Sequence, residues 1–258
     1  MEHARSTNLP DLIVDHMVAQ ILTGQLSAGD RLPPYRKLAA ALGVDQTSLR
    51  AALRVLDRMN LVRSVQGSGI TVNDYRRSAG LDLLDAMFRI EALELGRDLL
   101  EAGLSIFNRF VPILMRDAMA QIDAETMLDV SSTYRLLLDT ARRGGTPAAL
   151  AALDVKVVDT LAASLDDTYL RMVVNSSRRL RLGLTRRMLA SIDAVTHYEV
   201  LLDLFARHQA GSLDSTGFER DLRIQLQTVT QVLRREFEQL PAAPYLTAPI
   251  LDPDRMQA

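Results

Sequence analysis

The chain has no cysteine and no tryptophan among its 258 residues. The missing cysteine excludes disulfides, thiolate metal ligands and cysteine nucleophiles together, and it fits a reducing compartment. No apolar run approaches the roughly 20 residues that span a bilayer. The first residues also lack a basic patch followed by an apolar core. The sequence therefore predicts a cytoplasmic protein with no membrane partner.

Side chains suited to catalysis are scarce as well. The four histidines, His3, His16, His197 and His208, stand without a nucleophile signature. The sequence contains neither a glycine-rich phosphate loop nor a cluster of metal ligands. We therefore expect a protein that is not an enzyme and that carries no cofactor.

Charge is distributed unevenly along the chain. The net charge is −2, yet residues 31–77 carry nine arginines and lysines against three aspartates, so that stretch is +6 and the remainder is −8. A basic module attached to an acidic body is typical of a domain that faces phosphates, because cations supply the sequence-independent part of the affinity. An ordinary solvated charge run is the alternative, and charge alone does not separate the two.

The first 75 residues follow the pattern of three helices and a hairpin. Apolar residues at helical spacing predict helices over 9–24, 34–42 and 45–60, with Asp45 or Thr47 as the N-cap of the third. Short alternating stretches at 61–65 and 70–72, separated by Gln66-Gly-Ser-Gly69, indicate a β-hairpin. This order predicts a winged helix-turn-helix domain over residues 1–75, with a polar linker at 76–80.

In a helix-turn-helix, the N-terminal end of the second helix of the pair presents its side chains to base edges in the major groove. Gln46 has the donor and acceptor that adenine requires, and Arg50 suits a guanine or a phosphate. At the wing, Gln66 can reach the minor groove, and Gly67 lets the backbone approach the sugar-phosphate surface. A packed helix pair with a plain hairpin loop is the alternative. The predicted DNA-binding residues are Arg36, Asp45, Gln46, Thr47, Ser48, Arg50, Arg54, Gln66 and Gly67.

The runs Ile21–Pro33, Arg36–Val44 and Thr47–Arg54 together resemble the DNA-binding domain of the GntR family of bacterial regulators. The resemblance implies a regulator that reads operator DNA. Asp45 departs from the small hydroxyl or basic residue often found at its position, which leaves the operator sequence open. Family roles in operator contact fall on Arg36, Gln46, Thr47, Arg50, Gln66 and Gly67.

From residue 81 the pattern is helical almost throughout, and the proline-rich end at 241–258 is expected to be a flexible tail. The fold class is thus mainly α, a winged helix-turn-helix followed by an all-α bundle over residues 81–240. The predicted helices of this part cover residues 81–91, 93–121, 125–143, 147–164, 168–190, 194–210 and 215–239.

The bundle is similar to the FadR-type branch of the family in the runs Gly80–Met87, Leu153–Leu161 and Arg178–Met188. That likeness implies an all-α domain that binds a small effector and forms the dimer. It makes acyl-CoA a candidate effector, although a pocket arginine of the branch's fatty acid regulator falls near Gly103, and its tryptophan near Leu233.

Many relatives in that branch hold a metal with one aspartate and three histidines. Asp154 and His197 match two of these positions, whereas Val158 and Gln225 stand at two others. A metal is therefore not expected, and Asp154 with His197 would be ligands only of a degenerate site.

The predicted helix 168–190 carries six arginines, which suit an anionic effector such as a carboxylate or a phosphate. A solvated face is the alternative for these arginines, and core packing is the alternative for the tyrosines of the bundle. The candidate effector-binding residues are Arg178, Arg179, Arg186, Tyr134 and Tyr169.

Together these observations predict a sequence-specific transcriptional regulator, a repressor, that binds double-stranded DNA at a palindromic operator as a homodimer. A small effector in the bundle, acyl-CoA or another anionic metabolite, would modulate operator binding. The alternative is a dimeric DNA-binding protein that needs no effector.

Overall fold

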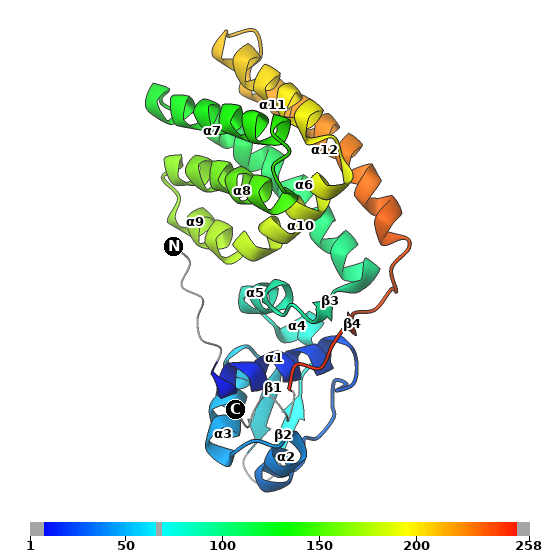
Figure 1. The fold of residues 1–258 in the computed structure, drawn as a ribbon. Helices are drawn as coiled ribbons and strands as arrows, with labels where there is room; N and C mark the ends of the chain where they lie inside the picture. The colour runs from blue at the N-terminus through cyan, green and yellow to red at the C-terminus, as the bar shows by residue number, and fades with distance from the viewer. Residues whose placement is uncertain (1–7, 66–68, 252–258) are drawn as a thin grey trace. The chain divides into compact units, whose positions relative to one another are not determined.

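The computed structural model describes residues 8–65 and 69–251, which form two compact units (Figure 1). The first unit contains the chain up to Gly96 together with the residues from Ala242 onward, and the second is Arg97–Pro241. A winged helix-turn-helix lies in the first, and the second is all-helical, so the predicted fold class is confirmed. Within the described ranges, none of the helices combines the length and apolarity needed to cross a membrane.

The first unit begins with α1 (Leu9–Leu22), α2 (Tyr35–Leu42) and α3 (Gln46–Arg58). Strands β1 (Val62–Val65) and β2 (Gly69–Val72) follow and pair antiparallel, with Val62 opposite Val72. The predicted helices and hairpin are therefore present. The two predicted wing residues, Gln66 and Gly67, lie outside the described residues.

The core of this module is the contact between α1 and α3. Ile13 and Met17 stand one turn apart on α1, and Leu49 and Leu56 lie two turns apart on α3, and all four are buried. Gly43 has a φ of +67°, which lets α2 end and the chain turn into α3. The packing leaves the opposite face of α3 exposed.

The first unit extends further along the chain than the sequence indicated. Helices α4 (Tyr75–Ser78) and α5 (Leu81–Arg89) follow the hairpin, and Arg89 of α5 forms an ion pair with Asp15 of α1 at 2.5 Å. The predicted boundary at residues 76–80 thus differs from the division at Gly96. The spacing of apolar residues predicted the helix α5. That spacing does not indicate which of the two units its apolar face packs against.

The described part of the predicted flexible tail, residues 241–251, contains a strand, whereas residues 252–258 lie outside the described residues. Strand β4 (Tyr245–Leu246) pairs antiparallel with β3 (Leu93–Glu94), and Figure 1 labels both strands. The N–H of Thr247 donates to the carbonyl oxygen of Ala92 at 2.9 Å. The prolines around this segment remove few hydrogen bonds because an edge strand needs donors on one side only.

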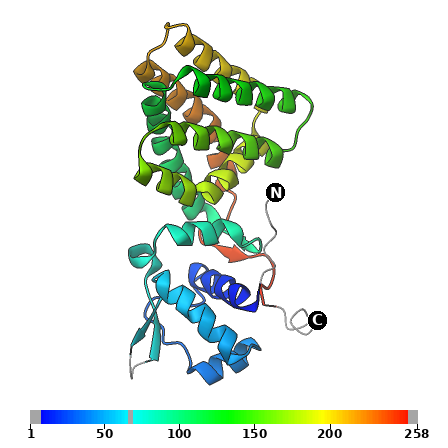
Figure 2. The ribbon, with the colours of Figure 1, turned by 90° about the vertical axis from the view of Figure 1, so that its left-hand side faces the viewer.

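The second unit consists of seven helices within the described residues (Figure 2). Helix α8 packs against α7, α9 and α10, and α11 packs against α7 and α12. The aromatic side chains of Tyr198, Phe205 and Phe218 are fully buried in its core. The helices are α6 (Gly96–Met119), α7 (Ala124–Arg142), α8 (Pro147–Ser164), α9 (Thr168–Ser176), α10 (Arg178–Ser191), α11 (Ala194–Gln209) and α12 (Ser215–Phe237).

The prediction of one helix over 168–190 is wrong, because the helix is interrupted at Ser177, between α9 and α10. Polar residues Asn175, Ser176 and Ser177 compete with helical hydrogen bonding through their own side chains. The carbonyl oxygen of Val174 accepts from Ser177 Oγ at 3.1 Å and from Arg181 Nη2 at 3.0 Å. Two side-chain donors thus satisfy a carbonyl at the end of α9.

Gly96→Ala tests whether the C-terminal segment is an integral part of the first unit. Gly96 has a φ of +69°, and a Cβ there would lie 2.5 Å from the backbone of Ala243. We expect a lower thermal midpoint and faster proteolytic cleavage near residue 243. The control is Gly144→Ala, with φ +74° and nothing within 4 Å. The control loses about 1 kcal/mol from left-handed strain, and Gly96→Ala loses roughly 1–3 kcal/mol more from the overlap. Equal losses would contradict the packing of the segment.

Candidate nucleic-acid interface

The exposed face of α3 carries the residues predicted to read DNA. Gln46, Arg50 and Arg54 recur at intervals of four residues, which places them along one stripe of the helix. All three are exposed, whereas Leu49, Leu53 and Leu56 on the other face are buried. The stripe therefore offers an amide and two guanidinium groups to solvent.

Asp45 begins α3. Its Oδ1 accepts hydrogen bonds from the backbone N–H groups of Thr47 at 2.8 Å and Ser48 at 2.9 Å. The side chain of Ser48 makes the largest contribution to lowering the pKa of the Asp45 carboxyl, and the backbone bonds from Ser48 and Thr47 act in the same direction. Of the two caps that the sequence allowed, the structure uses Asp45. Its predicted contact with DNA stays a prediction, alongside those of Thr47 and Ser48.

Two helices contribute cations next to the α3 stripe. The guanidinium carbon of Arg50 lies 5.6 Å from the ring centroid of Tyr35, a cation–π contact between α3 and the first residue of α2. Arg36 follows Tyr35 and is exposed. Sequence reasoning did not single out Tyr35, although its position between Pro34 and Arg36 at the start of a helix was visible. The contact restrains Arg50 beside the first residue of α2.

A separate cluster of polar side chains lies inside the helical unit. Arg181 of α10 is 3% exposed, and its Nη2 donates to Asp159 of α8 at 2.5 Å. Tyr198 of α11 donates its hydroxyl proton to Asp154 Oδ2 at 3.2 Å. The ring of Tyr134 on α7 lies 6.3 Å from that of Tyr198. These residues come from four helices and form the polar interior of the bundle.

Burial shifts the pKa values in this cluster. Desolvation raises the pKa of Asp154 to about 6, although the Tyr198 hydrogen bond and the charge of Arg181 act in the opposite direction. His197 is 3% exposed, and burial lowers its pKa to about 4. At neutral pH the surroundings therefore disfavour the ionised form of Asp154, and the imidazole of His197 is neutral.

The structure does not bring the five predicted effector residues together. Tyr134 is in the core, but Tyr169 is 82% exposed on α9. Arg178 pairs with Asp159 at 3.4 Å, and Arg186 is exposed. Arg179 is exposed on α10 as well. The arginine inside the bundle is Arg181, which the sequence had grouped with its neighbours, although Leu184 and Met188 follow it at helical spacing on the same buried face.

The residues of the cluster do not fit the metal that the family branch implied. His197 Nδ1 lies 3.4 Å from Gln225 Nε2, an amide nitrogen that cannot ligate a cation. Val158 is buried and apolar. Across residues 8–65 and 69–251, no group of three or more histidine, aspartate or glutamate side chains is arranged to hold a metal ion.

Comparison with known proteins places the winged module in a family. Residues 10–72, which run from α1 through β2, match the profile described as "Bacterial regulatory proteins, gntR family". The HTH-type transcriptional regulator Mce2R of Mycobacterium tuberculosis (strain CDC 1551 / Oshkosh) is 34% identical over 132 residues, 46% of this chain. The match covers 55% of that regulator, so the chain spans little more than half of its length.

Two further likenesses extend beyond the winged module. The fatty acid metabolism regulator protein of Enterobacter sp. (strain 638) is 25% identical over 180 residues, which is 70% of this chain and 72% of that protein. The solved structure of Lar, described as controlling the expression of the Listeria monocytogenes agr system, has a TM-score of 0.56 and 14% identity. It covers 88% of this chain and 97% of its own. At this identity the likeness shows the fold alone.

Two substitutions of Asp45 separate its capping role from its charge. Asp45→Asn keeps an oxygen that can accept from Thr47 and Ser48 and removes a negative charge. We expect it to bind duplex DNA more tightly than the wild type, measured by fluorescence anisotropy at fixed salt. Asp45→Ala loses the cap as well, so it should bind more weakly than Asp45→Asn. Equal affinities for the two variants would show that the cap does not order the start of α3.

Opposing titrations of Asp154 and His197 predict a pH signature. Between pH 6.5 and 4, the raised pKa of Asp154 adds stability on acidification, because the folded state takes up a proton before the unfolded state does. The lowered pKa of His197 removes stability over the same window. Relative to wild type, the free energy of unfolding of Asp154→Asn should fall more steeply on acidification, and that of His197→Gln less steeply. Each difference amounts to roughly 1–3 kcal/mol.

Urea unfolding followed by circular dichroism at several pH values measures these slopes. The control is Asp166→Asn, an exposed carboxyl just beyond α8. Its pH dependence should parallel that of wild type. A parallel curve for Asp154→Asn would show that the buried carboxyl does not titrate in this window.

Proposed function

We propose that this chain, which carries a domain of the gntR family of bacterial regulatory proteins at residues 10–72, is a transcriptional regulator that binds a palindromic operator as a homodimer. The observation that carries the proposal is the exposed α3 stripe of Gln46, Arg50 and Arg54, together with the exposed Arg36 of α2. A helix with one buried face and one polar, cationic face is what insertion into the major groove requires. Relatives named HTH-type transcriptional regulators support the same function.

A dimer explains how so few side chains on α3 could recognise an operator sequence specifically. One recognition helix contacts only a few base pairs, whereas two related by a two-fold axis read two half-sites about one helical turn apart. The operator of a symmetric dimer is then palindromic. Gln46 and Arg50 would supply base readout, and Arg36 and Arg54 phosphate contacts.

The helical unit is proposed to bind a small effector that releases the operator, which makes the protein a repressor. Support comes from buried polar atoms of the bundle that have no hydrogen-bond partner among the described residues, namely Asn108 Oδ1, Ser131 Oγ, Arg181 Nε and Thr185 Oγ1. Buried polar atoms are nearly always paired, so such a group indicates an interior that accommodates a further polar molecule. The likeness to a fatty acid metabolism regulator keeps acyl-CoA among the candidates. Effector binding would shift a population between two dimer arrangements.

Arg50→Ala tests the assignment of α3. An operator selected from a pool of random duplexes provides the ligand, and anisotropy titrations at several salt concentrations provide the affinity. We expect a loss of about tenfold or more, corresponding to roughly 1–3 kcal/mol for a lost base contact. If Arg50 contacts a phosphate instead, the salt slope falls by about one.

The matched control is Arg58→Ala, which removes the same charge from an exposed position at the other end of α3. Its operator affinity should stay close to that of wild type. An unchanged affinity and salt slope for Arg50→Ala, or equal losses for both variants, would contradict the assignment of α3 as the helix that contacts the operator.

A further inference from the structure

A cleft of about 370 Å³ lies between α6 and α12 of the helical unit, apart from the buried polar cluster. Its size is within the range of small-molecule sites, roughly 300–1,000 Å³. Three arginines line it, Arg109 from α6 and Arg223 and Arg234 from α12. The other lining residues are polar and neutral, namely Ser105, Asn108, Gln227 and Gln231. The cleft thus has neither a carboxylate nor an apolar side chain in its wall.

The spacing of these residues shows that the cleft is a continuous face of two helices. Arg223, Gln227, Gln231 and Arg234 recur every three or four residues, so they form one stripe of α12. A hydrogen bond connects the two helices at the cleft: Nδ2 of Asn108, a lining residue of α6, donates to Thr230 Oγ1 of α12 at 3.0 Å. A cross-helix hydrogen bond at this position fixes the distance between the two walls.

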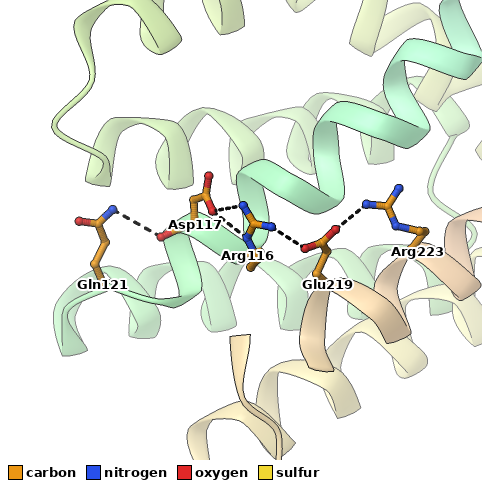
Figure 3. A network of polar contacts seen from close by, with 5 residues as sticks. All are labelled: Arg116, Asp117, Gln121, Glu219 and Arg223. Atoms are coloured by element: carbon orange, nitrogen blue, oxygen red, sulfur yellow. Dashed lines mark hydrogen bonds and ion pairs between the residues drawn. The ribbon is translucent and has the colours of Figure 1, made fainter. Parts of the chain in front are cut away.

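Two of the three arginines have no counter-charge. Arg109 and Arg234 are exposed, and neither forms an ion pair with any residue that the structure describes. Arg223 differs, because its Nη2 contacts Glu219 Oε1 at 2.5 Å (Figure 3). Glu219 also accepts from Arg116 of α6 at 3.0 Å, and the two arginines together lower the pKa of its carboxyl. The network drawn in Figure 3 thus restrains Arg223, which is one of the residues that line the cleft.

We propose that the α6–α12 cleft binds a small hydrophilic anion that carries two or more negative charges, with Arg109, Arg223 and Arg234 as its ligands. Guanidinium groups bind carboxylates and phosphates through paired N–H donors, and Gln227 and Gln231 add neutral amide donors. The polar wall excludes an acyl chain as the bound group, because an apolar chain would gain nothing by leaving water there. The anion would compete with Glu219 for Arg223.

Inorganic pyrophosphate and citrate are suitable probes, one for a phosphoryl ligand and one for a polycarboxylate. Isothermal titration calorimetry on the full chain, at ionic strength held constant with sodium chloride, should show saturable binding of at least one. The double variant Arg109→Gln/Arg234→Gln should lose about tenfold or more in affinity. The matched control Arg135→Gln/Arg235→Gln removes two exposed arginines that do not line the cleft and should bind as wild type does.

The variant Glu219→Gln provides an independent test of the proposed anion site. Loss of its carboxylate leaves Arg223 without its partner, so affinity for the probe should rise severalfold. An unchanged or lower affinity contradicts the placement of the anion at Arg223. No saturable binding of either probe, or equal losses in the two double variants, overturns the proposal.

The basic winged module also attracts anions, and a further variant separates the two sites. Arg36→Ala/Arg50→Ala should bind the probe as wild type does while it loses operator affinity. Loss of probe binding in this variant would place the anion on the DNA-binding face and refute the cleft. Loss of operator binding without loss of probe binding leaves the cleft standing, so this proposal and the proposed function fail by different measurements.

Discussion

The helical unit depends on the burial of one charged side chain, Arg181. An unpaired guanidinium in a protein interior costs several kcal/mol, so it persists only where carboxylates and carbonyls surround it. Here Asp159 supplies the charge, and the carbonyl oxygens of Val155 and Val174 accept two further hydrogen bonds. The last of these carbonyls is available because α9 ends nearby. The break at Ser177 and the buried cation are thus parts of one arrangement.

The same ion pair explains the state of Asp154. Asp159 takes the direct contact with Arg181, so Asp154 keeps only a more distant attraction to that cation and one hydrogen bond from Tyr198. Desolvation then dominates, and the pKa of Asp154 rises. The buried carboxyl that lacks a direct ion pair is therefore the one whose pKa burial raises.

The elements of this fold could be predicted because their signals are local. Proline and glycine at the ends of α2, an aspartate before α3 and apolar residues at helical spacing determine most helix bounds. The exposed stripe of Gln46 and Arg50 followed from the same spacing. Features that depend on contacts distant in sequence were missed. Helical spacing places Arg181 on the same face of α10 as Leu184 and Met188, but the carboxylate that makes its burial possible lies more than 20 residues away.

The C-terminal segment was missed for the same reason. A short proline-rich stretch reads as a tail unless its partner strand is known, and β3 is only two residues long. The α6–α12 cleft illustrates an intermediate case. The stripe Arg223, Gln227, Gln231 and Arg234 was visible in the sequence, but a polar stripe on a terminal helix reads as a solvated face. Only the presence of α6 opposite it makes a cleft.

The chain passes between its two units twice. It leaves the first unit at Gly96, where α6 begins, and returns at Ala242 after α12. At the base of these two helices, the N–H of Arg97 donates to the carbonyl oxygen of Pro241 at 2.8 Å. The two connecting segments continue into β3 and β4, which pair with each other. Because β3 precedes α6 and β4 follows α12, both helices connect directly to one ribbon of the unit that carries α3. The residues that line the α6–α12 cleft belong to these two helices, whereas Asp154, Arg181 and Tyr198 lie on helices with no direct connection to the first unit.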